Sequence, residues 1–348
     1  MPPAMPGDGV LTQSANAIRK TVRLAAQLRR LPGRVAALER SLRDLTEVQR
    51  GHRLVIDQTT LPDPLLWEGR PPLLASREPG VNVFDRGGLC RQDSFEQPYF
   101  SFWSARLNDR LRYHRKLWEF VFIAQALWER GVCRPGRRGL GFGVGREPLT
   151  ALFASEGVAV TATDLAADGR VKSGWEATNQ HAAGKEALRN AAICPDALFD
   201  RNVEFTPCDM NAVPEDLTGY DFCWSACALE HLGSITHGLA FIERSVECLV
   251  PGGWAVHTTE FNIASNDKTV DNEGTVLFRK RDIEALMQSL SDQGHEVAEV
   301  DWSWGDGPVE QYLDLPPFRE EPHLKMALGG FETTSIGLII RKKRAAFA

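Results

Sequence analysis

The sequence predicts an α/β protein whose mostly parallel sheet is covered by helices on both faces. From residue 117 onward, apolar stretches of strand length alternate with stretches in which apolar residues recur at helical spacing. Strands joined in this way by helices run parallel and are buried on both faces.

The expected elements follow one another in a regular order. A helical stripe over residues 117–127 precedes the strand that begins RRGLG and runs into a glycine loop. A short helical face then leads to the strands VAVTATD, VEFTPCDM and GYDFCWSAC. A helix over residues 235–249 precedes the strand WAVHTTEF, and a helix over residues 283–290 precedes EVAEVDW and TTSIGLIIR.

The composition narrows the class of protein. The chain has 348 residues, of which 43% are hydrophobic and 25% charged, as in a soluble globular protein with a sizeable core. Its net charge is −6, and an acidic body argues against general nucleic-acid binding. The seven cysteines are scattered without CxxC pairs, so we expect reduced core thiols in a cytoplasmic protein. We expect neither a secretory signal nor a membrane span.

Three regions are expected along the chain. Residues 1–50 form a basic helical arm, residues 51–110 a Pro- and Gly-rich connector that packs on the body, and residues 111–348 the body. The segment 303–334 interrupts the hairpin that closes the sheet, and long loops are uncommon unless functional. We expect an insertion there that suits carbohydrate binding, with a structural flap as the alternative.

The arm carries an apolar seam of heptad spacing. It holds nine Lys or Arg residues against four Asp or Glu. Pro32 lies inside the seam and predicts a kink or a break into two helices. We expect residues 24–45 to form a homo-oligomer or to bind a glycosyltransferase partner, with a peripheral contact to the inner membrane as the alternative. The seam consists of Leu24, Leu28, Leu31, Val35, Leu38, Leu42 and Leu45.

The stretch GLGFGVGREP suggests a ligand that lies against bare backbone, because glycine weakens a strand unless close approach or a positive φ requires it. A phosphate-binding P-loop needs Lys and then Ser or Thr after the glycines, where this chain has Arg146 and Glu147. A dinucleotide motif needs a third glycine at Arg146. Asp164 ends the next strand, where a carboxylate can bind both ribose hydroxyls of an adenosine. The pattern therefore favours an adenosine ligand without phosphates.

Five motifs in order then resemble a known family. GLGFGVG matches the first motif of the class I S-adenosylmethionine-dependent methyltransferases, Asp164 the acid that ends their second strand, and CDM their third-strand acid. YDFCWSACALEH and ECLVPGGWAVHTTEF are similar to the motifs of their fourth and fifth strands. The blocks HRKLWEF, GREPL, ALEHLGSI and HTTEFN resemble a bacterial subgroup associated with polysaccharide and glycan modification.

The resemblance implies a Rossmann-like, doubly wound sheet of seven strands, the last one antiparallel, with S-adenosyl-L-methionine as cofactor. The family often has Asp or Glu where Gly139 stands, so the contact to the methionine amine must come from elsewhere in this chain. The implied cofactor-binding residues are Gly141, Gly143, Gly145, Asp164, Leu165, Asp209, Met210 and Ser225.

Methyl transfer to a hydroxyl also requires a group that takes the proton. His231 follows the fourth strand and Glu260 the fifth, at the edge where open α/β sheets bind ligands, so these two are the catalytic candidates. A helix-capping role is the alternative for His231. A divalent metal bound by this pair is a further alternative, although we expect none. The candidate substrate-binding residues are Glu230, Asn262 and His323.

Other polar side chains have plainer explanations. His257 lies within a strand and is expected to be a hydrogen-bonded core histidine. His114, Arg115 and Trp118 could close over the cofactor, and a structural tryptophan with surface charges is an equal alternative. His181 lies in a long segment that could form a lid.

The function that we expect is transfer of a methyl group from S-adenosylmethionine to a hydroxyl of a sugar or glycan intermediate. One alternative is an N- or carboxyl methyltransferase of small molecules, which needs no base. Another is a non-catalytic scaffold of the same fold that recruits glycan enzymes.

Overall fold

The structure is a computed structural model that describes residues 70–81, 83–166, 182, 184–272 and 274–345. The predicted arm with its heptad seam lies outside the described residues, as do His181 and the first part of the predicted connector. The expectations for those segments stay predictions.

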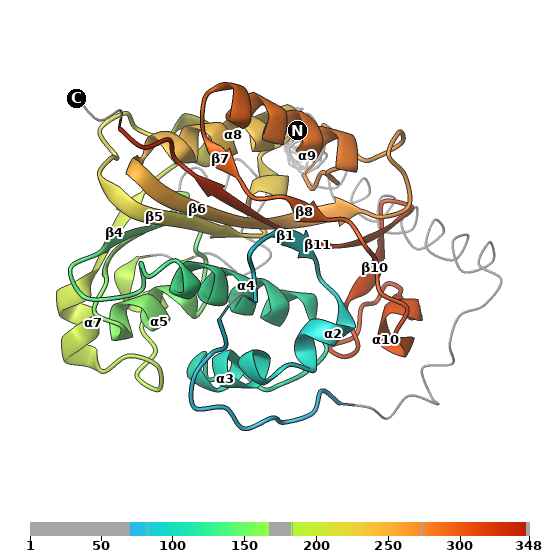
Figure 1. The fold of residues 1–348 in the computed structure, drawn as a ribbon, viewed down its shortest axis with the longest axis horizontal. Helices are drawn as coiled ribbons and strands as arrows, with labels where there is room; N and C mark the ends of the chain where they lie inside the picture. The colour runs from blue at the N-terminus through green and yellow to red at the C-terminus, as the bar shows by residue number, and fades with distance from the viewer. Residues whose placement is uncertain (1–69, 82, 167–181, 183, 273, 346–348) are drawn as a thin grey trace, which may run out of the picture. The chain divides into compact units, whose positions relative to one another are not determined.

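One large mixed sheet forms the centre of the molecule (Figure 1). From β2 the chain first adds β3 and β4 on one side of that strand. It then adds β5, β6 and β11 on the other side, so the strand order reverses between β2 and β5. The strands from β4 to β6 are parallel, and β11 runs antiparallel to β6. The predicted Rossmann-like α/β class is confirmed. The order is β4 (Val203–Pro207), β3 (Ala159–Asp164), β2 (Arg138–Gly141), β5 (Tyr220–Ala226), β6 (Leu249–Asn262) and β11 (Phe331–Arg341).

The sheet is larger than predicted, with eleven strands among the described residues where seven were expected. β11 is long, and its backbone groups need partners along its whole outer edge. Short strands supply them: β7 (Glu296–Val297), β1 (Gly87–Leu89) and β10 (Lys325–Leu328) all pair with β11. β8 (Val300–Asp301) pairs with β1, and β9 (Leu313–Asp314) pairs with β10.

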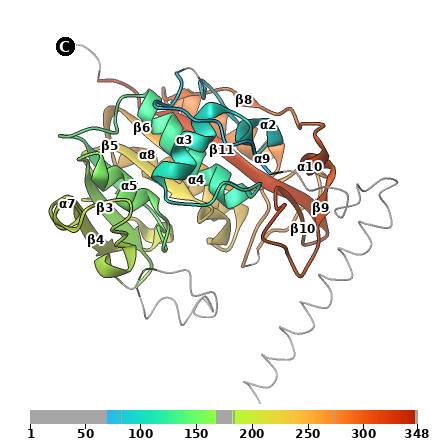
Figure 2. The ribbon, with the colours of Figure 1, turned by 90° about the horizontal axis from the view of Figure 1, so that it is seen from below.

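Helices cover both faces of the sheet, as Figures 1 and 2 show. On one face, the apolar core joins α2 (Gln92–Phe95), α3 (Pro98–Arg106), α4 (Arg115–Glu129), α5 (Leu149–Ser155) and α7 (Asp196–Asn202). On the other face, the core joins α8 (Ile235–Glu247) and α9 (Lys280–Asp292). The predicted helix over residues 235–249 ends two residues early, because Leu249 begins β6.

α4 places its first turn at the edge where the parallel strands end. The Nδ1 atom of His114 caps the helix by accepting from the N–H of Lys116 at 3.1 Å. The predicted apolar stripe is buried at Leu117, Ala124 and Leu127 and packs against β6 and β11. The polar residues of the first turn are therefore held beside the ends of these strands.

The predicted connector and insertion are both more ordered than expected. The described part of the connector, from residue 70, forms β1, α2 and α3 and buries Phe100 and Trp103. The insertion contains α10 (Pro308–Gln311), whose Glu310 accepts from the N–H of Gln92 at 2.7 Å. Both segments thus belong to the folded body and lie beside β11.

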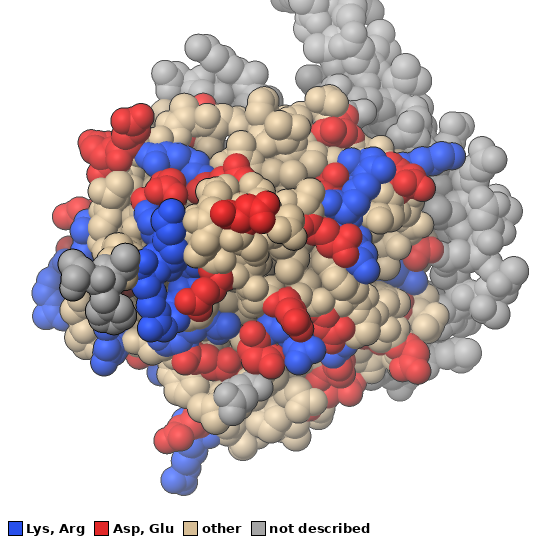
Figure 3. Space-filling model, turned by 45° about the horizontal axis from the view of Figure 1, so that its top comes forward, with Lys and Arg blue, Asp and Glu red and all other residues tan. Residues whose placement is uncertain are grey.

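The surface of the described residues carries charged side chains of both signs. On the face shown in Figure 3, Lys and Arg side chains are interspersed with Asp and Glu. No helix among the described residues is long and apolar enough to cross a membrane.

Candidate functional site

The glycine loop after β2 combines two different reasons for glycine. A Cβ atom on Gly139 would lie 2.5 Å from the ring of Phe222, and one on Gly141 would lie 2.5 Å from the indole of Trp224. These two glycines make room for aromatic side chains of β5. Gly143 and Gly145 have φ angles of 57° and 51°, which side chains rarely adopt, and they turn the loop at the end of β2.

The predicted adenosine-binding acids lie at the ends of the neighbouring strands. Asp164 ends β3, is buried, and accepts from the N–H groups of Leu165 at 2.7 Å and Ala182 at 2.8 Å. Asp209 follows β4, is exposed, and caps the short turn η3 (Met210–Ala212). The sulfur of Met210 would lie 3.0 Å from a Cβ atom on Gly143, so η3 packs against the glycine loop.

Ser225 and His257 belong to a buried bridge within the body. The hydroxyl of Ser225 lies 2.8 Å from Nδ1 of His257, whose Nε2 lies 2.9 Å from the hydroxyl of Ser245 on α8. Burial lowers the pKa of His257 to about 3, so this histidine is neutral. The prediction of a hydrogen-bonded core histidine is confirmed. The side chain of Ser225 joins the sheet to α8 instead of facing the loop that we expected it to serve.

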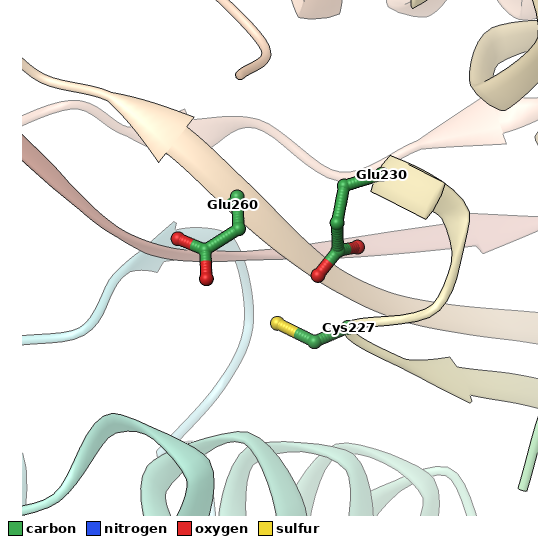
Figure 4. A group of neighbouring side chains, drawn as sticks. All are labelled: Cys227, Glu230 and Glu260. Atoms are coloured by element: carbon green, nitrogen blue, oxygen red, sulfur yellow. The ribbon is translucent and has the colours of Figure 1, made fainter. Parts of the chain in front are cut away.

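A cluster of buried polar side chains fills the edge beyond β5 and β6. In Figure 4, Cys227 after β5, Glu230 in the turn η4 (Leu229–His231) and Glu260 on β6 point toward one another. One ligand-type atom from each lies within 4.8 Å of the others. Cys227 has a φ of 45°, a left-handed conformation that is uncommon outside glycine and frequent at functional sites.

The first turn of α4 neutralises part of this cluster. Arg115 forms an ion pair with Glu260 and lies 3.1 Å from Glu119, while Lys116 contacts Glu119 at 3.0 Å. The thiol of Cys227 donates to Glu119 at 2.9 Å. Three buried carboxyl groups therefore face two cations, and full ionisation would leave one negative charge uncompensated.

The pKa values show which carboxyl groups keep a proton, so that the uncompensated negative charge does not form. Burial raises the pKa of Glu260 to about 7, although Arg115 opposes the shift, and burial also raises the pKa of Glu230. Glu119 differs, because Lys116 and Arg115 outweigh its burial and lower its pKa to about 2. The Oε2 atom of Glu260 is sealed from solvent and has no hydrogen-bond partner among the described residues. Glu119 is thus the ionised member, and Glu230 and Glu260 are the members that hold or release protons.

His231 lies at the rim of the cluster, and its side chain is partly exposed. Its Nδ1 lies 3.0 Å from the carbonyl oxygen of Gly274 and 3.2 Å from the hydroxyl of Thr275, and since a carbonyl can only accept, Gly274 favours the tautomer with the proton on Nδ1. In that tautomer the lone pair is on Nε2, which lies 3.8 Å from a carboxyl oxygen of Glu230. This is the tautomer that a base acting through Nε2 requires.

The predicted substrate-binding residues divide into three cases. Glu230 is buried in the cluster and accepts from Thr259 at 3.0 Å. Asn262 uses its side-chain amide to hold the following loop, with bonds to the carbonyl of Lys268 and the N–H of Ser265, so it is an organiser of that loop rather than an open contact for substrate.

His323, in the insertion, lies directly beside the start of α4. Its carbonyl accepts from the N–H of Arg115 at 2.9 Å, and its ring lies 4.7 Å from the ring of His114. Nδ1 of His323 donates to the buried carboxylate of Asp314 at 2.6 Å. An aspartate that orients a histidine in this way fixes which nitrogen faces a ligand.

Several residues of the site were missed by the sequence analysis. Glu119 and Lys116 could have been found from their spacing of three residues on one helix face. Cys227 carried no signal, because its role depends on a backbone conformation. Glu147 closes the glycine loop, and its buried carboxyl accepts from the indole N–H of Trp224 at 2.5 Å.

Comparisons with known proteins give a fold likeness alone. No family model and no curated protein matches the chain. An S-adenosylmethionine-dependent methyltransferase from Mesorhizobium loti is 15% identical, with 62% of this chain and 98% of that chain covered and a TM-score of 0.38. The magnesium protoporphyrin IX methyltransferase from Synechocystis PCC 6803, solved with bound SAH, is 13% identical, with 72% and 98% covered and a TM-score of 0.36.

A third similar structure, the 4+2 cyclase SpnF, is 17% identical, with 64% of this chain and 82% of that chain covered and a TM-score of 0.40. Two of these three proteins are methyltransferases by name. Their TM-scores are too low to decide the reaction of this chain, which depends on its own topology and side chains.

Proposed function

We propose that this protein transfers a methyl group from S-adenosylmethionine to a hydroxyl of a sugar or glycan intermediate. The proposal rests on one observation: two features of the site lie at the same edge of the sheet. The glycine loop follows β2, and the cluster of Cys227, Glu230 and Glu260 follows β5 and β6, on either side of the point where the strand order reverses. Doubly wound sheets bind their ligands at that point.

The cofactor would lie across the loop. Gly143 and Gly145 present bare backbone, Asp164 would bind the ribose, and the exposed Asp209 would bind the adenine. The methyl-bearing sulfur of S-adenosylmethionine is a cation. Because burial raises the pKa values of Glu230 and Glu260, a cation beside these groups would favour their ionised forms.

The chemistry is a displacement at the methyl carbon. An oxygen lone pair of the acceptor forms the new C–O bond, the C–S bond breaks, and S-adenosylhomocysteine leaves as a neutral thioether. The hydroxyl proton goes to Nε2 of His231, whose tautomer with the proton on Nδ1 is favoured by Gly274. The rest of the rate comes from holding the two reactants in line.

The acceptor would be held by Glu260 and by the insertion. Oε2 of Glu260 is an acceptor without a partner, suited to a hydroxyl donor. His323 is oriented by Asp314 and stacked beside His114, and the partly exposed ring of Phe318 lies 5.6 Å from His323. Polar groups next to an aromatic ring suit a hydroxyl-bearing sugar ring.

The alternative functions differ in which of these residues they require. Methylation of an amine or a carboxylate needs no base, so His231 would be dispensable. A scaffold without catalysis needs neither His231 nor the loop. A divalent metal is less favoured, because Arg115 already lies 3.4 Å from the sulfur of Cys227 and pairs with Glu260.

Calorimetric titration with S-adenosylhomocysteine tests the cofactor. Gly143→Ala should lower the affinity at least 10-fold, since its Cβ atom would lie 2.9 Å from Ala228 and force the loop to shift. Gly131→Ala is the matched control, because Gly131 also has a positive φ but has open space around it. Equal affinity in wild type and Gly143→Ala, or no binding at all by wild type, would refute the cofactor assignment.

A transfer assay tests the acceptor class. Methyl-labelled S-adenosylmethionine would be incubated with nucleotide sugars, with free monosaccharides, and with small amines and carboxylic acids. Label transferred only to the amines or acids would overturn the proposed acceptor.

A further inference from the structure

Glu147 is a buried carboxyl group that neither the fold nor the proposed methyl transfer accounts for. It stands directly after the glycine loop and is 9% exposed. Its backbone N–H donates to the carbonyl of Val144 at 3.0 Å, so the backbone of Glu147 is part of the turn that ends the loop. A buried carboxyl group is costly unless it is paired or protonated.

Only one of its two oxygens is occupied. Oε1 accepts from the indole of Trp224 at 2.5 Å, and among the described residues no side chain or backbone group bonds to Oε2. The cation that acts on it is Lys116, which forms its ion pair with Glu119. The described part of the chain therefore offers Glu147 no cation of its own.

The position of Glu147 relates it to the proposed ligand. The charged groups that act on it are Lys116 and Glu119 of the cluster and Asp164 at the ribose position. Glu147 is therefore within electrostatic range of both the place proposed for the adenosine and the cluster beside the place proposed for the methyl group. The sulfur of S-adenosylmethionine also bears the amino-acid end of the molecule, and the α-ammonium group of that end is a cation.

Gly139, the position where an acid is expected from the family resemblance, is closed to any side chain by Phe222. We infer that Glu147 binds the α-ammonium group of S-adenosylmethionine through Oε2, while Trp224 holds Oε1. This inference rests on the proposed function and adds a binding residue to it.

Burial raises the pKa of Glu147 to about 8, so near neutral pH the empty site holds a proton on this carboxyl group. An ammonium group beside Oε2 favours the ionised carboxylate. Binding of the amino-acid end should therefore release a proton, which a merely structural hydrogen bond to Trp224 would not do.

The test compares S-adenosylhomocysteine with 5′-methylthioadenosine, which keeps the adenosine and the thioether but lacks the amino-acid end. Both would be titrated by calorimetry into wild type and Glu147→Gln at about pH 7. Glutamine keeps an oxygen for the Trp224 indole. The variant should bind S-adenosylhomocysteine roughly 10- to 100-fold more weakly, with methylthioadenosine affinity unchanged.

Repeating the titrations in buffers of different ionisation enthalpy adds a second measurement. Wild type should release up to about one proton per S-adenosylhomocysteine bound, and Glu147→Gln should release fewer. Methylthioadenosine should release few protons in either protein. Glu147→Asp, which keeps the charge and shortens the side chain, should show a partial loss if glutamine impairs folding.

The outcomes separate the two proposals. If wild type binds both ligands and Glu147→Gln binds S-adenosylhomocysteine equally well, the role of Glu147 is wrong and the cofactor assignment stands. If Glu147→Gln weakens both ligands equally, Glu147 supports the loop and does not bind the ammonium. If wild type binds neither ligand, both proposals fall.

Discussion

Arg115 and Glu260 form an ion pair that joins the first turn of α4 to β6. The same guanidinium contacts Glu119 and Cys227, so one side chain connects three elements around the cluster. Because Arg115 fixes Oε1 of Glu260, the unpartnered Oε2 is held in a defined direction. The arrangement suits a group that holds an acceptor in place.

Glu260→Gln should therefore raise the KM of the acceptor more than it lowers kcat, because the amide keeps the size of the side chain but loses the charge that pairs with Arg115. Steady-state kinetics with the acceptor found by the transfer assay would measure both constants. A loss confined to kcat would contradict this role and place Glu260 on the path of the proton.

His231→Ala should lower kcat by roughly 10²- to 10⁴-fold while S-adenosylhomocysteine still binds, because a positioned base contributes about that factor. His237→Ala is a suitable control: His237 is nearby, and its Nδ1 also bonds a backbone carbonyl, that of Leu232 at 3.0 Å. Near-normal kcat in His231→Ala, with chemistry shown to limit the rate, would remove His231 from the mechanism.

His323→Ala and Asp314→Asn should both raise the KM of the acceptor and leave the affinity for S-adenosylhomocysteine unchanged. The asparagine variant should have an effect because an amide no longer stabilises the same orientation of the ring. His295→Ala gives a control, since His295 bonds to the N–H of Lys343 in the C-terminal segment. Normal acceptor KM in both variants would show that the insertion has a structural role only.

The stability of Glu147→Gln should depend on pH differently from that of wild type. Because burial raises the pKa of Glu147 from 4.5 to about 8, the folded chain keeps a proton that the unfolded chain has lost between those values. The free energy of unfolding of wild type therefore falls as pH rises through that window. The variant should gain on the order of 1–3 kcal/mol relative to wild type between about pH 5 and about pH 9.

Thermal unfolding of both proteins across that range, without ligand, measures the difference. A constant difference between them would mean that Glu147 does not titrate in this window.

Removal of the arm should change the state of association. Sedimentation of the full chain against a chain that starts near residue 55 tests whether residues 24–45 bind to one another through their leucines. Equal monomeric mass for both chains would contradict self-association, and binding to anionic vesicles would then be measured for the arginines of the arm.

Local patterns in the sequence were enough to predict the strands and helices of the central body. The strands around the glycine loop and the core role of His257 follow from alternation, helical spacing and position within a strand. The order of the parallel strands was implied by the family resemblance. Local patterns did not predict β1, β9 and β10, because β1 and β10 form where β11 offers them an edge and β9 forms where β10 does.

Residues of the candidate site could be predicted only from their positions at or after the ends of strands, as Asp209, His231 and Glu260 were. The pairing of Arg115 with Glu260 and of His323 with Asp314 depends on contacts between distant segments. Asn262 shows the opposite error. Its place after a strand suggested substrate binding, while the fold uses its amide to hold residues 265–269.

The packing of glycines against aromatic rings couples the residues allowed in the glycine loop to those allowed in the sheet interior. A side chain larger than glycine at position 141 is compatible with the fold only if Val144 moves and Trp224 becomes smaller, and a smaller residue at position 224 removes the indole donor to Glu147. The same exchange of volume links Gly139 to Phe222. A single substitution in β5 can therefore alter the charge state of a carboxyl group in the loop without touching any ligand.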